Sequence, residues 1–366
     1  MQSGLWSRFI VCAAAVVTLT GLASCGGGSS NDNMPAATRF KMSIVVSDGA
    51  VPAPHTDPNL KNGWGVAFNP NGFVWVANNG TQTATLYDGN GVVQSLVVSI
   101  PATANGPANP TGIVFNKGPD LTLARNGKSG VAAFIFAGEG GSITAWAPAV
   151  DMTHAFTAVD SSASGAIYKG LAIATTAAGG HRLYATDFHN NRIDVFDGTF
   201  TKIVVPGGFT DTQIPAGFAP FGIQAIGSKI FVTYAKQDSD AEDDVPGAGQ
   251  GFVDVFDLDG NLMQRFAANG PLNAPWGIAQ APGNFGTFSN DILVGNFGDG
   301  TINAFDPNSG AFVGQFMNTD GTPLVQRSLW GIAFGNNLSA QPSNTLFFAA
   351  GPNFEADGVY GRIDMQ

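Results

Sequence analysis

Cysteine, histidine and basic residues are scarce in this chain of 366 residues. It contains two cysteines, four histidines and 16 Lys plus Arg residues against 27 acidic residues, a net charge of −11. No basic cluster could neutralise a run of phosphates, so nucleic acid is not an expected partner. The chain also lacks the His-Glu-x-x-His and Gly-x-Ser-x-Gly motifs. The chain is therefore expected to have neither the zinc centre of proteases with the first motif nor the nucleophilic serine turn of hydrolases with the second.

The first 25 residues read as a targeting segment. Arg8 precedes an apolar run at residues 9–19, and Leu22-Ala23-Ser24-Cys25 closes the segment in the manner of a cleavable signal. The segment resembles the lipobox of bacterial lipoproteins, which implies that Cys25 becomes the lipidated first residue. The alternative is an ordinary secretory signal in which the cysteine occurs by chance. The Gly/Ser/Asn-rich tract at residues 26–33 favours the lipoprotein interpretation, because a flexible linker is expected between a lipid anchor and a folded domain.

The lipoprotein interpretation predicts three segments in the chain and a mature protein without a free thiol. We predict a signal peptide at residues 1–24, a flexible tether at 25–38 and one domain at 39–366. Cys12 leaves with the signal and Cys25 would be acylated, so no disulfide is expected. Beyond the signal no apolar run reaches about 18 residues, so the lipid anchor would be the only membrane contact. Gly26 rather than Asp after Cys25 implies, by resemblance to lipoprotein sorting rules, an outer-membrane address in the cell envelope, either periplasmic or surface-facing, and we expect a monomer.

Six segments of the chain share one pattern, in which a mostly aromatic or polar residue is followed by glycine and an apolar run. The glycines are Gly65, Gly112, Gly170, Gly222, Gly277 and Gly331, spaced 47, 58, 52, 55 and 54 residues apart. A repeat of this length is typical of propellers and related arrays, so the pattern predicts six structural units.

Each unit continues with further strand-like segments. A short apolar strand is expected at residues 73–77, 133–137, 182–185, 230–234, 292–295 and 346–349. An alternating strand follows at 85–88, 193–197, 253–257 and 302–306, and turns such as Gly89-Asn90-Gly91 lead to a fourth strand, for example at 262–266 or 311–316. Four strands in each of six units predict an all-β fold, a six-bladed β-propeller.

The two ends of the chain fit together in this fold. The last unit stops after its third strand, at residues 358–364, while an orphan strand at residues 40–47 precedes the first unit. We therefore predict that the N-terminal strand closes the last blade and completes the ring.

The blade pattern resembles that of NHL-type and gluconolactonase-like six-bladed propellers. Motifs such as Ser164-Gly165-Ala166-Ile167-Tyr168-Lys169-Gly170-Leu171 and Gly295-Asn296-Phe297-Gly298-Asp299-Gly300 are also similar to those of a family of exported bacterial proteins of unassigned function. The resemblance covers nearly the whole chain from about residue 40. It implies a fold and export, and it implies no reaction.

Polar residues recur in the loop between the second and third strands of every unit, which opens on the face where propellers usually bind ligands. By resemblance to the metal set of gluconolactonase-like propellers, Glu139, Asp187, Asn296 and Glu355 are candidate ligands for Ca²⁺ or another divalent metal. The alternative is that these loops are polar because they meet water. Further candidates on this ligand face are Asn79, Lys169, His189, Lys236, Asp238 and Asp299. The densest charge run, residues 238–244, fails the EF-hand pattern and reads better as a solvated loop.

The residues before the repeated glycines form a second candidate group. Trp64, Phe221, Trp276 and Trp330 are aromatic, and such a ring either stacks a flat ligand or packs between blades. Packing is the favoured interpretation. Lys169 stands at the corresponding place in the third unit, where it would form a structural ion pair with Asp187 or Glu139 or orient an anionic ligand.

Three functions fit these patterns. The first is a lipid-anchored binding module for a protein, glycan or small ligand, supported by the tether, the acidic face and the lack of a recognisable catalytic set. The second is a divalent-metal-dependent hydrolase or lactonase of the gluconolactonase-like type, which rests on resemblance alone. The third is a structural surface protein whose channel is plugged by aromatic side chains. We expect the first.

Overall fold

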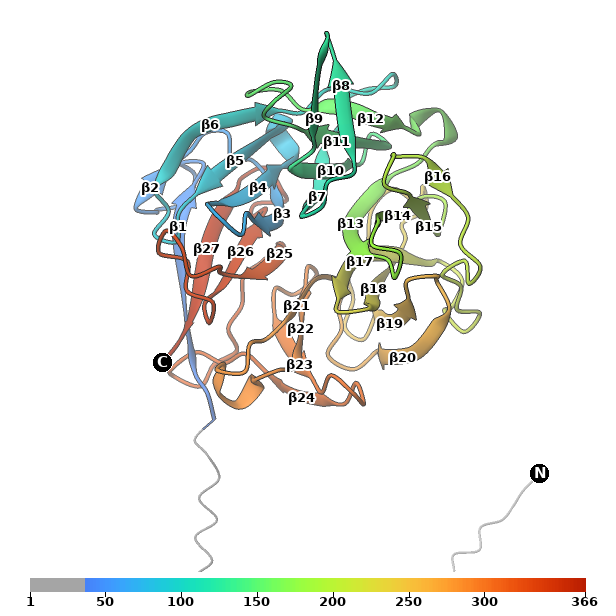
Figure 1. Cartoon of the computed structure of the whole chain (residues 1–366). Coiled ribbons are helices and arrows are strands. Elements are labelled where there is room, and N and C mark those ends of the chain that lie inside the picture. The colour runs from blue at the N-terminus through green and yellow to red at the C-terminus, as the bar shows by residue number, and fades with distance from the viewer. Residues whose placement is uncertain (1–36) are drawn as a thin grey trace, which may run out of the picture. The chain divides into compact units, whose positions relative to one another are not determined.

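Strands rich in β-branched and aromatic residues form six sheets around a central axis (Figure 1). The computed structural model describes residues 37–366. The predicted signal, Cys25 and nearly all of the predicted tether fall outside the described residues. Within the described part of the chain, no helix is long and apolar enough to cross a bilayer.

The first three blades are antiparallel sheets of four strands, built from consecutive segments of the chain. Blade 1 contains β3 (Gly63–Phe68), β4 (Val74–Asn78), β5 (Thr83–Tyr87) and β6 (Val93–Ser99). Blade 2 contains β7 (Pro110–Phe115), β10 (Phe134–Gly138), β11 (Ser142–Trp146) and β12 (Phe156–Asp160). Blade 3 contains β13 (Tyr168–Thr175), β14 (His181–Asp187), β15 (Arg192–Phe196) and β16 (Lys202–Ile203).

The remaining blades repeat this order. Blade 4 contains β17 (Phe218–Ile226), β18 (Lys229–Lys236), β19 (Phe252–Asp257) and β20 (Leu262–Ala268). Blade 5 contains β21 (Pro275–Gln280), β22 (Ile292–Asn296), β23 (Ile302–Phe305) and β24 (Phe312–Gln315). Blade 6 contains β25 (Leu329–Phe334), β26 (Leu346–Ala350), β27 (Val359–Met365) and β1 (Phe40–Ser47), and β2 (His55–Thr56) pairs in parallel with β1. Three single-turn 3₁₀ helices, η1 (Asn79–Thr81), η2 (Ser162–Ser164) and η3 (Gly286–Phe288), lie in loops. The predicted six-bladed propeller with four-stranded blades is confirmed.

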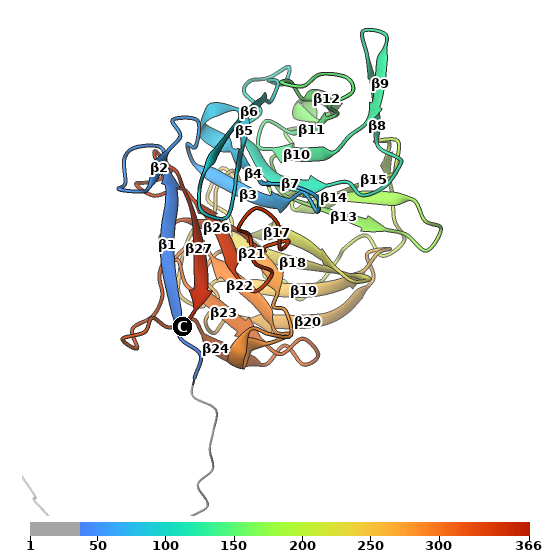
Figure 2. The same ribbon diagram turned by 60° about the vertical axis from the view of Figure 1, so that its left-hand side comes forward.

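The N-terminal strand closes the ring as predicted. β1 pairs antiparallel with β27 from Phe40 opposite Met365 to Ser47 opposite Val359, with one bulge near Ile44. Figure 2 shows β1 and β27 side by side along the edge of the blade. Both ends of the described chain therefore belong to one sheet, and the outer edge of blade 6 is built by the N-terminal segment.

The repeated glycines mark the places where neighbouring inner strands approach most closely. In all six, a Cβ atom would lie under 3.0 Å from backbone atoms of the next blade, which real Cβ atoms essentially never do. At Gly277 the clash would be with the carbonyl oxygen of Trp330, and at Gly331 with that of Trp64. The glycine of each repeat is thus a packing requirement of the ring.

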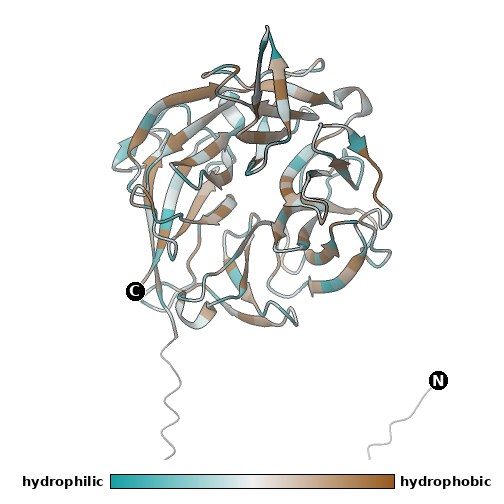
Figure 3. Ribbon diagram, viewed as in Figure 1, coloured by the Kyte–Doolittle hydropathy of each residue, from teal (hydrophilic) through white to brown (hydrophobic). Residues whose placement is uncertain are grey.

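The hydrophobic core of the described residues has seven parts, one between each pair of adjacent blades and a seventh in the central channel. Blades 1 and 2 bury Trp75, Phe134 and Trp146 between them, and blades 5 and 6 bury Phe40 and Phe316. Figure 3 shows apolar residues concentrated on the strands and hydrophilic residues in many of the loops. Because the middle of each sheet is covered on both faces by its neighbours, second strands such as β4 and β10 are buried throughout, whereas outer strands such as β20 and β24 are mostly exposed or half-buried.

One hairpin was not predicted. β8 (Thr122–Arg125) and β9 (Lys128–Val131) form a two-stranded sheet between β7 and β10, and it projects from the ring in Figures 1 and 2. Asn126 and Gly127 have φ angles of 51° and 77°, as a two-residue Asn-Gly turn requires. This insertion accounts for the longest repeat interval, the 58 residues between Gly112 and Gly170.

Candidate functional site

The central channel is closed in the middle by aromatic side chains. The indole rings of Trp64 and Trp330 stack with centroids 3.4 Å apart, and Trp276 lies edge-on to both at 5.8 and 5.7 Å. Phe221 and Phe297 also contact Trp330. Trp276, the most exposed of the four predicted aromatic residues, is only 8% exposed. The four therefore pack against one another, with no open ring face for a flat ligand.

Lys169 occupies the same layer from blade 3, and it is 2% exposed. Its Nζ atom lies 2.5 Å from Oε1 of Glu139 and 2.9 Å from Oδ1 of Asp243. The same ammonium lies 5.4 Å from the ring centroid of Trp64. Burial alone would lower the pKa of Lys169, but the attraction of Glu139 and Asp243 outweighs it and raises the pKa. Lys169 is therefore a charged, buried ion-pair partner of Glu139, one of the pairings expected from the sequence.

Further carboxylates surround this ion pair. Glu355 accepts a hydrogen bond from Asn62 Nδ2 at 2.7 Å, and burial together with repulsion from Glu139 raises its pKa. Burial also raises the pKa of Asp244 to about 7, although Lys169 opposes the shift. Asp244 Oδ2 is buried and has no hydrogen-bond partner among the described residues. We call Glu139, Lys169, Asp243, Asp244 and Glu355 the acidic mouth, in which four carboxyl groups surround one ammonium.

A groove of about 540 Å³ runs beside the acidic mouth. It is bordered by Glu139, Asp243 and Glu355 and by the loops that enter the inner strands of blades 2 and 3. The lining residues that carry polar side chains are Thr103, Asn105, Asn109, Glu139, Ser162, His189, Glu242, Asp243 and Glu355. His189, a predicted ligand-face residue, lies in this groove. Asn105, Asn109 and Ser162 are functional candidates that sequence reasoning missed, because their loops carry no repeated pattern.

The acidic segment at residues 238–244 does not remain wholly in solvent. Asp238 accepts the backbone N–H of Glu242 at 3.0 Å, and Ala241 adopts a left-handed φ of 58°. This turn directs Asp243 to Lys169 and places Asp244 against the ion pair. The solvated-loop interpretation holds for Asp240, Glu242 and Asp243, all exposed, although the Asp243 carboxylate also pairs with Lys169, and it is wrong for Asp244.

The four candidate metal ligands are not brought together. Glu139 and Glu355 lie at the acidic mouth, but the side chain of Asp187 is fully buried within its own blade. Its carboxylate lies 3.0 Å from Arg192 Nη2 and accepts the backbone N–H of Ile167 at 3.2 Å. Asp187 is therefore committed to holding the loop between β14 and β15.

Asn296 is committed in the same way in blade 5. Its amide nitrogen donates to the carbonyl of Pro271 at 2.7 Å, and its oxygen accepts the backbone N–H of Asn273 at 3.1 Å. Across residues 37–366, no group of three or more His, Cys, Asp or Glu side chains is placed to hold a metal ion. Of the two candidates that remain at the mouth, Glu139 pairs with Lys169 and Glu355 accepts a hydrogen bond from Asn62, so this set does not fit a divalent metal.

The other predicted ligand-face residues have mixed roles. Asn79 is buried and donates to Glu139 Oε2 at 2.8 Å, so it orients the mouth. Asp299 accepts the backbone N–H of Thr301 at 3.0 Å and stabilises its own loop. Lys236 is exposed at the end of β18 and forms no ion pair with any residue that the structure describes.

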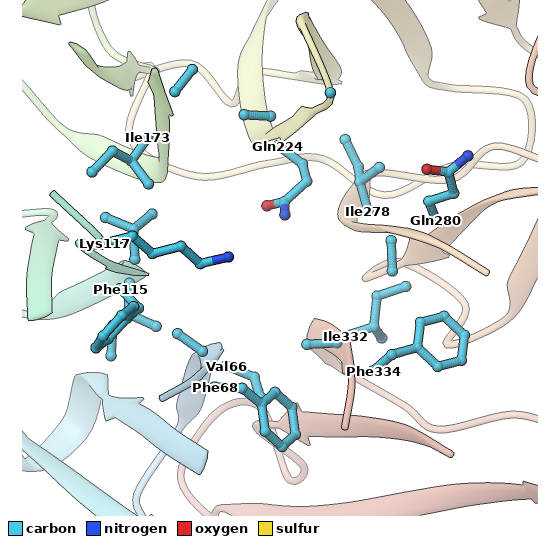
Figure 4. Close-up of a pocket in the computed structure, with 18 of the residues that line it drawn as sticks. Val66, Phe68, Phe115, Lys117, Ile173, Gln224, Ile278, Gln280, Ile332 and Phe334 are labelled. Carbon is cyan, nitrogen blue, oxygen red and sulfur yellow. The ribbon is translucent and has the colours of Figure 1, made fainter. Parts of the chain in front are cut away.

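The opposite opening of the channel is a funnel of about 540 Å³, which the sequence did not predict. It is lined by the C-terminal halves of all six inner strands, and Figure 4 shows Val66, Ile173, Ile278 and Ile332 on its walls. Lys117 also belongs to the lining, and its amine points into the lumen in this view. The apolar residue after each repeated glycine was the feature of the sequence from which this funnel could have been predicted.

Comparison with known proteins identifies relatives and fold neighbours. No protein-family model matches the chain. Uncharacterized protein R648 of Acanthamoeba polyphaga mimivirus is 34% identical over 336 residues, which cover 90% of this chain and 81% of that protein. This chain belongs to the same family. A second member, uncharacterized protein L690 of the same virus, is 33% identical over 90% of this chain and 86% of its own length. These relatives are viral, and the exported bacterial family expected from the sequence stays a prediction.

Solved structures similar to this family member share its fold at low sequence identity. A Bacteroides thetaiotaomicron protein of unknown function has a TM-score of 0.56 at 12% identity, covering 90% of this chain and 76% of that one. The soluble aldose sugar dehydrogenase of Escherichia coli has a TM-score of 0.55 at 11% identity, covering 89% and 99%. A candidate gluconolactonase has a TM-score of 0.52 at 12% identity, covering 91% and 93%. At these identities the similarity shows the fold alone, and one fold hosts many unrelated functions.

Proposed function

We propose that this protein is a binding module that holds a cationic ligand, carrying an ammonium or guanidinium group, at the acidic mouth. The observation that carries the proposal is the surplus of negative charge there. Four carboxyl groups surround Lys169, and Asp244 Oδ2 is buried without a partner. A buried carboxylate without a partner is costly, and a ligand cation would remove that cost.

The groove beside the mouth is large enough to bind a small ligand or one protruding side chain of a partner protein. Its volume of about 540 Å³ is within the range of about 300–1,000 Å³ usual for ligand sites. Asn105, Asn109 and Ser162 line it and offer neutral donors and acceptors that would orient the ligand. The net charge of −11 would also attract a cation from a distance.

The same residues give less support to the alternative function, a metal-dependent hydrolase. A metal-dependent reaction of the gluconolactonase-like type needs an oxygen donor set around one ion. Asp187 and Asn296 are held within their own loops, and Glu139 is paired with Lys169. We therefore assign no reaction step to a metal at this mouth.

Titration calorimetry with spermine would test the proposal. We expect Glu355→Gln and Asp244→Asn each to weaken spermine binding about tenfold, because a charge pair in a partly buried site contributes about 1–2 kcal/mol. Asp320→Asn is the matched control, since Asp320 is exposed in the loop before β25. Equal spermine affinity in all four proteins would refute a specific cation site, and maltohexaose binding in its place would favour a neutral glycan ligand.

We also propose, from the sequence alone, that the chain is exported and anchored through Cys25 in the outer membrane as a monomer. Expression in a Gram-negative host with an alkyne fatty acid would test this. We expect label on the wild-type chain in the outer-membrane fraction and none on Cys25→Ala. An unlabelled, cleaved wild-type chain in the periplasm would indicate a plain secretory signal instead.

A further inference from the structure

We propose that the funnel is a second binding site, for a small molecule that joins an apolar body to one carboxylate. The funnel lies at the other ends of the inner strands from the acidic mouth. The two sites therefore share no lining residue, and this inference does not depend on the proposed function of the mouth.

The funnel has mixed walls, with an aliphatic ring at its inner end and polar side chains, among them Thr175, Gln224 and Gln280, nearer the opening. The residue after each repeated glycine belongs to a ring of six aliphatic side chains below the aromatic layer: Val66, Ile113, Leu171, Ile223, Ile278 and Ile332. Phe68, Phe115 and Phe334 also border the funnel, but their rings turn away from the lumen and pack between blades. Apolar surface that stays in water in the free protein is available to stabilise a ligand, at about 25 cal/mol for each Å² removed from water.

The funnel is closed at its inner end, which makes it a bowl. Only a void of about 40 Å³ remains beside Trp276, among the aliphatic ring, and the stacked rings of Trp64 and Trp330 lie within the channel. A ligand that enters the funnel therefore cannot reach Lys169. Its apolar end would rest on the aliphatic ring and its polar end would face the opening.

Lys117 supplies the charge that selects a carboxylate. It follows β7 in the chain, and its amine points into the lumen (Figure 4). Among the residues that the structure describes, it forms neither an ion pair nor a side-chain hydrogen bond. The nearby carboxylate of Asp120 is already committed to His181, whose Nδ1 lies 2.7 Å from Asp120 Oδ1. Lys117 is thus a cation without a counterion, among the described residues, at the opening of a bowl whose inner end is aliphatic.

Gln224 adds a neutral polar group inside the bowl. Its side chain points into the lumen in Figure 4, and it makes no side-chain hydrogen bond to any described residue. An amide can donate to one carboxylate oxygen while an ammonium pairs with the other. Few convergent polar groups within an apolar wall are typical of small-molecule sites.

Displacement of the fluorescent probe 8-anilinonaphthalene-1-sulfonate by decanoate tests this site in the signal-free protein. We expect decanoate to displace the probe, whereas decanol does so at least tenfold less well and decyltrimethylammonium does not. Lys117→Gln should weaken decanoate about tenfold and leave decanol unchanged. Gln224→Trp should fill the lumen and abolish displacement by either compound, with circular dichroism confirming that the variant folds.

Two controls separate the outcomes. Lys128→Gln changes an exposed lysine on the β8–β9 hairpin and should leave decanoate binding unchanged, as should Glu355→Gln at the acidic mouth. Decanoate affinity that survives Lys117→Gln, or probe binding that survives Gln224→Trp in a folded protein, would overturn the proposal. Because Lys117 is exposed, its replacement tests the site even if the tryptophan variant fails to fold. A wild-type protein that binds decanoate but not spermine would refute the proposed function of the mouth alone.

Discussion

The two openings of the channel have nearly the same volume and opposite chemistry. The acidic mouth gathers its charges from loops, and it surrounds Lys169 with carboxyl groups. The funnel is made mostly by the inner strands themselves, and its ammonium, Lys117, has no partner in the described chain. The comparison teaches that the residue after each repeated glycine gives the inner strands an aliphatic ring. The carboxyl groups of the acidic mouth come from loops, whereas Lys169 and Gln224 are polar residues of the inner strands β13 and β17.

Removal of the buried ammonium should disturb one opening and spare the other. Lys169→Met leaves Glu139 and Asp243 without their cation, and we expect a loss of about 2 kcal/mol in the free energy of unfolding, less than for a fully buried pair because Asp243 is largely exposed. Urea denaturation measures this loss. Probe binding in the funnel should be unchanged in buffer without urea.

The matched control for this variant is Lys236→Met, because Lys236 is exposed and forms no ion pair among residues 37–366. The double variant Lys169→Met, Glu139→Gln should recover part of the stability, since it also removes one uncompensated charge. If Lys169→Met and Lys236→Met have equal free energies of unfolding, the ion pair at the mouth contributes nothing to the stability of the protein.

The acidic mouth should also respond to pH near neutrality. The folded-state pKa of Asp244 is raised from 3.8 to about 7, so between these values the folded state binds a proton that the unfolded state releases. Stability from this group is therefore present at low pH and is lost as pH rises through 7. We expect Asp244→Asn to gain about 1–2 kcal/mol over wild type at pH 8, less than the full shift implies because the residue is partly exposed.

Urea denaturation at pH 4, 6 and 8 checks this difference, which should be smallest at pH 4 and largest at pH 8. Asp240→Asn, an exposed change in the same loop, should track wild type at every pH. A constant difference between Asp244→Asn and wild type would contradict the assigned titration. The affinity of the funnel for decanoate should not change with pH in the range where Asp244 ionises.

The smallest expected effect concerns the loop that carries Glu355. Asn353, Phe354 and Glu355 have φ angles of 56°, 54° and 67°, and Phe354 is 99% exposed. Left-handed backbone is costly for side-chain-bearing residues, so Phe354→Gly should stabilise the protein by about 0.5–1 kcal/mol after the added entropy of the unfolded chain is counted. Thermal denaturation measures this gain. Phe354→Ala keeps the strain, and an equal gain in both variants would show that the exposed ring, not the backbone, is responsible.

The repeats made the fold predictable and left most of the site unpredictable. Glycines at regular intervals report a close approach of neighbouring strands, which is a property of the ring as a whole. Lys169 and Glu139 were placed on the correct face because they sit at fixed positions in the repeat. Asp187 and Asn296 occupy equivalent loops, but hydrogen bonds to Ile167 and Pro271 turn them away from the mouth.

Loop geometry decided the other discrepancies. The Asn-Gly turn at Asn126 was a readable sign of the β8–β9 hairpin. The contact of Asp243 with Lys169 depends on a left-handed residue, Ala241, that composition does not indicate. Lys117 was missed because it lies outside the repeated pattern, in a loop whose path only the structure shows.

The pairing of β1 with β27 has a consequence for the order of folding. Blades 1 to 5 each consist of a continuous stretch of chain, whereas blade 6 joins Phe40 to Met365. Contacts between such distant residues form slowly, because a large loop must close before they contribute. During synthesis β1 cannot pair until β27 has been made, so the ring stays open until then. A circular permutant that joined the two ends and opened between blades 3 and 4 would make every blade continuous, and it should close faster with the same set of contacts.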